Sequence, residues 1–255
     1  MWLERKRSEM GQIRKYEHYT IKERPLRPSY ENDWIERGLS KHKSNYSMVI
    51  CFETSDPARF EQLKNLFCYS PPQNYKAHKV FVYDSWNGLG MLNESGQIIP
   101  YTPGVTGRFK EELGGKLKDL AQVLNIMDAK LKNEETVFII YGLPKEIEGK
   151  TYLISALRSW ANSPRLILKH SLIILLGMAF SVMLDEETRE LIAVIDVEIG
   201  KDSEYEKLID YLADTFGIKL AEEEKGVLKS ALKGLNLHQS EAILRESYTL
   251  KGRFD

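Results

Sequence analysis

Three apolar runs between residues 136 and 199 constrain the fold more than any other feature of the sequence. They read TVFIIY (Thr136–Tyr141), LIILLGMAFSVML (Leu172–Leu184) and LIAVIDVEI (Leu191–Ile199), and an amphipathic stretch, Thr151–Ala161, separates the first two. Continuous runs rich in Ile and Val are typical of parallel strands buried on both faces, and the amphipathic stretch predicts a crossover helix. The sequence therefore predicts an α/β fold with a parallel sheet.

Two earlier segments, Tyr46–Phe52 and His78–Ser85, have the same strand character, so we expect a sheet of about five strands. The stretch Trp86–Gly107 is rich in Gly, Asn, Pro and Ser, and it predicts either a long irregular loop or a short hairpin. Phe109–Lys132 carries a leucine stripe at helical spacing and predicts a single helix.

Three successive amphipathic helices without an intervening strand are predicted after Asp202, with Gly217 and Gly234 at plausible C-terminal caps. We therefore divide the chain into an N-terminal extension (residues 1–45), an α/β core (residues 46–200) and a small helical lid (residues 201–255).

Composition indicates a protein of the reducing interior of the cell. The two cysteines, Cys51 and Cys68, imply no disulfide framework, and a cytoplasmic location is expected. The most apolar run, Leu172–Leu184, is shorter than the roughly 20 residues that span a membrane, so no membrane association is expected. The net charge of −1 argues against a generally nucleic-acid-binding surface.

The N-terminal extension is locally basic, with 11 Lys or Arg residues against 7 Asp or Glu residues, and it is rich in aromatic residues. One interpretation is an arm for single-stranded nucleic acid, because bases stack on aromatic rings while Lys and Arg hold phosphate. We favour the other, in which aromatics such as Trp34 pack on the core or on a neighbouring subunit, since aromatic residues commonly anchor protein contacts.

A phosphate-binding loop would be expected after the first strand of such a core, because Gly-rich backbone N–H groups and a Lys there cradle phosphate. The chain instead reads ETSDPARF after Phe52, with neither Gly nor Lys, and Glu53 and Asp56 lie where phosphate would sit. Thr54 or Ser55 is expected to cap the helix that follows. Carboxylates there repel a triphosphate, so no phosphate site is expected at this turn.

A partial match to a phosphate-binding loop occurs at PKEIEGKT, which follows one predicted strand, precedes a helix and ends in Gly149, Lys150 and Thr151. Its first position is Pro144, which lacks both the N–H and the conformational range of Gly. We interpret it as a solvated loop whose Thr151 caps the helix. The alternative is a site for ATP and Mg²⁺ formed by Gly149, Lys150 and Thr151.

Other candidates for catalysis are weak. The strand Thr136–Tyr141 stands where a magnesium-binding acid would be expected, yet it runs on to Gly142 without one. Five histidines are scattered along the chain and form neither a metal-binding pattern nor a Ser-His pair. The sequence therefore predicts no catalytic residue, no metal ligand and no cofactor for this chain.

The order of elements and several local phrases resemble an AAA-type ATPase module with the P-loop-NTPase fold. The resemblance is to the degenerate N-terminal module of tandem AAA proteins from plastids, cyanobacteria and archaea. It rests on ETVFIIYGLP (Glu135–Pro144), HSLIILLG (His170–Gly177), LDEETRELIAVIDVEIG (Leu184–Gly200) and a lid ending in KGRFD. A lid arginine of the family has no counterpart here, because its usual position reads Leu235-Asn236-Leu237-His238.

The resemblance implies a module that has lost nucleotide chemistry and serves assembly, regulation or partner binding at the start of a longer AAA ATPase. Its expected partners are further copies of itself or a following AAA module, and nucleic acid is not favoured. Two alternatives remain: an ATP-binding or ATP-hydrolysing domain that uses Gly149, Lys150 and Thr151, and a nucleic-acid-binding module that uses the basic extension.

Overall fold

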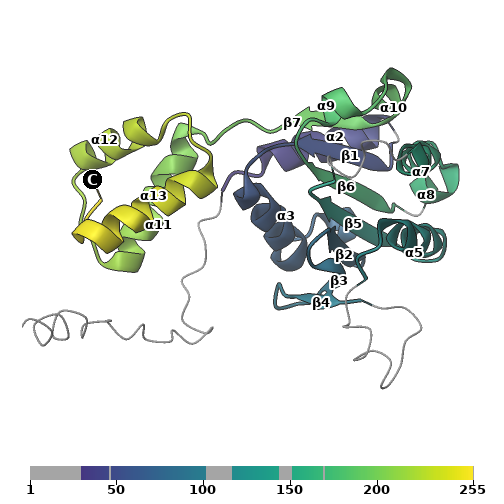
Figure 1. Cartoon of the computed structure of the whole chain (residues 1–255), viewed down its shortest axis with the longest axis horizontal. Coiled ribbons are helices and arrows are strands. Elements are labelled where there is room, and N and C mark those ends of the chain that lie inside the picture. Colours follow the sequence, from purple (N-terminus) through teal and green to yellow (C-terminus); the bar gives the residue numbers. More distant parts are fainter. Residues whose placement is uncertain (1–29, 46, 102–116, 144–150, 169, 255) are drawn as a thin grey trace, which may run out of the picture.

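A computed structural model describes residues 30–45, 47–101, 117–143, 151–168 and 170–254. The described strands form one seven-stranded sheet in the order β4-β3-β2-β5-β6-β1-β7 (Figure 1). They are β1 (Val49–Glu53), β2 (Lys79–Asp84), β3 (Gly88–Leu92), β4 (Ile98–Pro100), β5 (Thr136–Tyr141), β6 (Leu172–Gly177) and β7 (Ala193–Asp196). The predicted α/β class is confirmed.

The five predicted strands pair in parallel as β2-β5-β6-β1-β7, and two further strands extend this sheet beyond β2. These two, β3 and β4, are antiparallel and come from the stretch for which a loop or a hairpin was expected. The Asn93 side chain accepts hydrogen bonds from the backbone of Ser95 and Gln97, and Gly96 takes a positive φ of 76°. This local turn chemistry closes the hairpin.

Alternate side chains of the central strands enter two separate cores, as expected for a sheet covered on both faces. Along β6, Ile173 and Leu175 belong to one core, whereas Ile174 and Leu176 belong to the other. Two helices, α2 (Asp33–Asn45) and α3 (Pro57–Tyr69), pack on the second face. The first face is covered by α5 (Leu120–Asn133), α7 (Thr151–Ala161), α8 (Pro164–Leu168), α9 (Phe180–Met183) and α10 (Glu186–Leu191) (Figure 1).

Two local details differ from the sequence-based expectations. The helix predicted over Phe109–Lys132 is α5 and begins only at Leu120, with Asp119 as its N-cap, because Leu117 instead forms a β-bridge with Leu89. Residues 109–116 of that prediction lie outside the described residues. The N-cap of α3 is Asp56 rather than Thr54 or Ser55.

Helix α2 belongs to the core, although its residues fall in the predicted extension. Trp34 and Ile35 are buried in the core shared with β1 and α3, and the Trp34 ring packs edge-on against Phe52 at 4.7 Å between centroids. For Trp34, this packing agrees with the favoured interpretation that the aromatic residues of the extension pack on protein.

The lid helices are α11 (Asp202–Phe216), α12 (Glu222–Leu232) and α13 (Leu237–Lys251), and they lie beside the α/β core at the end of the linker that follows β7 (Figure 1). They enclose a third apolar core that includes Leu208, Leu212, Leu232 and Leu244. Gly217 ends α11 with a left-handed φ of 66°, as predicted. Among the described residues, no helix has the length and apolar character that crossing a membrane requires.

Candidate functional site

The strand order places a candidate site at the carboxyl end of β1. This strand is the first in the chain, yet it lies between β6 and β7. The helix that follows β1 packs on one face of the sheet, whereas the helices that follow β6 pack on the other. Open parallel sheets bind ligands outside such a point, where the connections diverge. The turn after β1, residues 54–56, is therefore the first place to look for chemistry.

Asp56 at this turn joins the core to the lid. Its carboxylate accepts hydrogen bonds from the backbone N–H of Ala58 (2.9 Å) in α3 and from the N–H groups of Leu237 (2.9 Å) and His238 (3.3 Å) in α13. The side chain is buried. One carboxylate thus caps the N-termini of two helices, whose unpaired N–H groups and dipoles both favour negative charge.

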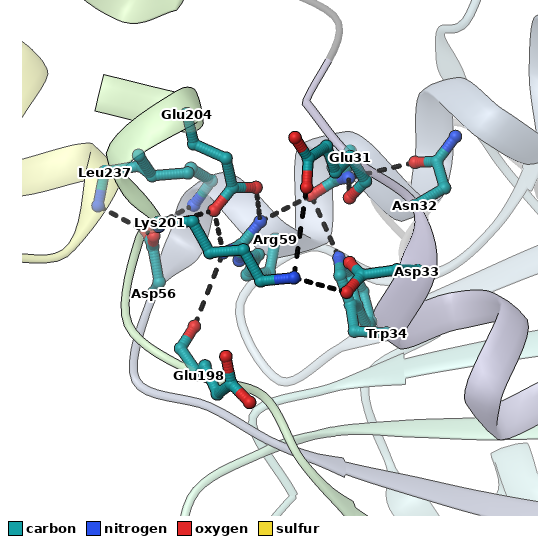
Figure 2. A network of polar contacts seen from close by, with 12 residues as sticks. Glu31, Asn32, Asp33, Trp34, Asp56, Arg59, Glu198, Lys201, Glu204 and Leu237 are labelled. Carbon is teal, nitrogen blue, oxygen red and sulfur yellow. Dashed lines mark hydrogen bonds and ion pairs between the residues drawn. The ribbon is translucent and has the colours of Figure 1, made fainter. Parts of the chain in front are cut away.

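A buried ion pair lies one helical turn away (Figure 2). The Arg59 guanidinium donates two hydrogen bonds to the Glu204 carboxylate, from Nη1 at 2.6 Å and from Nη2 at 2.8 Å, and the two side chains are 3% and 1% exposed. Burial alone would lower the pKa of Arg59, but the hydrogen bonds to Glu204 and its negative charge outweigh burial and raise that pKa. The pair joins α3 to the first turn of α11.

Further polar contacts extend this junction toward the start of α2. Gln62 accepts hydrogen bonds from Arg59 Nη1 (3.0 Å) and Trp34 Nε1 (3.2 Å), and its own amide donates to the Glu31 carbonyl (2.6 Å). Lys201, next to α11, pairs with Asp33, and its hydrogen bond, aided by its positive charge, holds the pKa of Asp33 below its usual value. The network therefore fixes α2, α3 and α11 to one another (Figure 2).

Acidic and aromatic side chains occupy the neighbouring strand ends. Glu53, at the end of β1, accepts hydrogen bonds from the backbone N–H (3.2 Å) and the hydroxyl (2.8 Å) of Ser181 at the start of α9. Tyr141, at the end of β5, stacks on Phe60 with 4.7 Å between the ring centroids. Burial raises the pKa of Tyr141, and the negative charges of Asp56 and Asp84 raise it further. The ends of β1 and β2 thus carry the acidic residues Glu53 and Asp84.

The predicted alternative cofactor residues are only partly covered by the structure. Gly149 and Lys150 lie outside the described residues, and Thr151 is the exposed first residue of α7. Among the residues that the structure describes, no group of three or more His, Cys, Asp or Glu side chains is arranged to hold a metal ion.

Sequence reasoning missed the roles of Asp56, Arg59 and Gln62, although two signals were present. Asp56 followed by Pro57 is a typical start of a helix. Arg59 precedes Leu63 and Phe67 by four and eight residues, so it shares the buried face of α3. A charged residue on an apolar helical face requires a buried partner. The partner, Glu204, lies 145 residues further along the chain.

No match was found when the sequence was compared with protein-family models and with curated proteins. Solved structures do show similarity. The replication initiator DnaA bound to AMPPCP and single-stranded DNA superposes with a TM-score of 0.51 at 13% identity, covering 87% of this chain and 62% of that one. The fold of this chain is similar to that of AAA-type ATPase domains.

A second structure, described as a DNA replication initiation factor, agrees with this assignment. It superposes with a TM-score of 0.50 at 12% identity, covering 87% of this chain and 61% of that one. The present chain thus spans less than two thirds of the length of either protein. The two superpositions establish a shared fold.

Proposed function

We propose that this chain is an AAA-type module that has lost nucleotide chemistry and acts through protein contacts, in assembly or in regulation. In this proposal it is the N-terminal part of a longer AAA ATPase, as in the tandem AAA proteins whose degenerate module its sequence resembles. Its partners are further copies of itself or a following AAA module, within the cytoplasm.

One observation carries the proposal. The position that a nucleotide phosphate would take, at the N-terminus of the helix after the first strand, holds the buried Asp56 carboxylate instead. Displacing the Asp56 carboxylate is unfavourable, because three backbone N–H groups would then lose their hydrogen-bond acceptor. A phosphate brought beside it would meet like charge in a poorly solvated place, which costs several kcal/mol. A module built in this way retains the fold but has little capacity to bind ATP there.

We expect the chain neither to bind ATP tightly nor to hydrolyse it. The measurement is a titration with a fluorescent ATP analogue, with and without Mg²⁺, accompanied by an assay of phosphate release. The same measurements are made on the Lys150→Ala variant for comparison. Micromolar binding that this variant abolishes would contradict the proposal and support a site formed by Gly149, Lys150 and Thr151.

The nucleic-acid alternative has one observation in its favour, since the similar DnaA structure is described as bound to single-stranded DNA. We expect removal of residues 1–29, which leaves α2 in place, not to change the affinity for a fluorescent single-stranded oligonucleotide. Binding is measured at two salt concentrations, because phosphate contacts weaken steeply as salt rises. A salt-sensitive affinity that disappears with the truncation would favour nucleic-acid binding instead.

A further inference from the structure

Three backbone N–H groups from two distant parts of the chain point to one place at the junction of core and lid. They belong to Ala58 in α3 and to Leu237 and His238 in α13, helices of 13 and 15 residues. The N-terminus of a helix attracts anions, because its N–H groups lack partners and its dipole is positive there. Two such ends facing each other provide more donors than a single helix cap needs.

A buried cation reinforces this place. Arg59 lies in the same first turn of α3, and its guanidinium is paired with Glu204. Its Nε atom is buried and has no hydrogen-bond partner among the described residues. One buried donor of Arg59 is therefore left unsatisfied beside the junction, and the negative charge of Asp56 acts on the same guanidinium.

We propose that the junction between α3 and α13 is an anion site of the oxyanion-binding kind, which the chain fills with its own Asp56 carboxylate. The carboxylate oxygens take hydrogen bonds as phosphate oxygens would, and they link the core to the lid without any bound ligand. The lid is thereby held against the core permanently, rather than in response to a nucleotide. This inference rests on the proposed function, because an ATP phosphate at this turn would have to displace Asp56.

The decisive variant is Asp56→Ser. Serine is as good an N-cap as aspartate, so the N-terminus of α3 remains capped. The shorter, neutral side chain cannot accept the hydrogen bonds from Leu237 and His238, and it leaves room for an anion. We expect this variant to melt at a lower temperature in chloride. We also expect millimolar inorganic phosphate, at matched ionic strength, to restore much of the loss and to bind measurably by calorimetry. Hydrogen exchange in α13 should slow when phosphate is added.

Asp119→Ser is the matched control, because Asp119 caps α5 alone, through the N–H of Gln122. Phosphate raises the melting temperature of most proteins slightly by exclusion from their surfaces, and this control and the wild type measure that general effect. A response of Asp56→Ser no larger than theirs would overturn the inference. Calorimetric phosphate binding to the wild type equal to that of Asp56→Ser would overturn it as well.

Failure of the variant to fold would still be decisive. If Asp56→Ser folds in phosphate but not in chloride, the inference is supported. If it folds in neither while Asp56→Asn folds, the side chain serves only as a structural link and the inference is wrong. Tight ATP binding by the wild type would contradict the proposed function, whereas an Asp56→Ser variant that ignores phosphate would contradict only this inference.

Discussion

Replacing Glu204 with alanine is expected to destabilise the protein by about 3–5 kcal/mol, because the substitution leaves the buried charge of Arg59 without a partner. Arg59 is 3% exposed, so water cannot replace the two hydrogen bonds that it loses. The free energy of unfolding, measured by urea denaturation, tests this expectation. A loss below about 1 kcal/mol would mean that the junction relaxes to hydrate Arg59 and that the pair contributes little.

Two further variants separate the ion pair from general effects on α11. Glu206 lies in the same helix, and its carboxylate is half exposed and 3.8 Å from Lys229. We therefore expect Glu206→Ala to change the free energy of unfolding by no more than about 0.5 kcal/mol. The double variant Arg59→Met, Glu204→Leu replaces the pair by apolar groups and should recover most of the stability lost in Glu204→Ala. If the double variant is as unstable as Glu204→Ala, the loss of stability arises from packing rather than from the unpaired charge.

Truncating the lid core by Leu212→Ala or Leu232→Ala is expected to cost about 2–5 kcal/mol, since each side chain is buried between lid helices. Because the third core is separate from the two cores of the sheet, we expect the loss to fall on the lid. Native-state hydrogen exchange should then accelerate within residues 202–254 and stay slow in β5 and β6. The domain division at residue 200 depends on this result.

Leu250→Ala is the control for this experiment, because Leu250 lies on α13 but is 74% exposed and should change stability little. Equal acceleration of exchange in the lid and in β5 would contradict the prediction. It would mean that the contacts of Asp56 and Arg59 make core and lid one cooperative unit.

Local patterns explain which elements were predictable. The central strands read as unbroken apolar runs because both of their faces are buried, as the alternation along β6 shows. The lid helices carry their own helical periodicity and a Gly217 cap, so they too could be predicted. The sequence could not distinguish the hairpin β3–β4 from an irregular loop, because its strands are short, contain two glycines and lie at the edge of the sheet.

The helix α5 shows the opposite case, in which tertiary pairing overrides periodicity. Its leucine stripe continues toward the N-terminus through Leu117 as far as Leu113, and this pattern predicted that the helix starts at Phe109. The backbone of Leu117 instead pairs with Leu89 in β3, and Asp119 caps the helix after it. A helical period cannot reveal that a neighbouring strand will take the same backbone groups.

The sequence by itself determined the α/β class, the parallel core strands, the helical lid and the absence of Gly and Lys from the turn after β1, because each depends on residues close together in the chain. Only the tertiary structure decided what occupies that turn. Asp56 meets Leu237 across 181 residues, and Arg59 meets Glu204 across 145. Such contacts arise from how the sheet and lid pack together. The carboxylate at Asp56, which in the sequence only argues against phosphate, thereby becomes the link between the two.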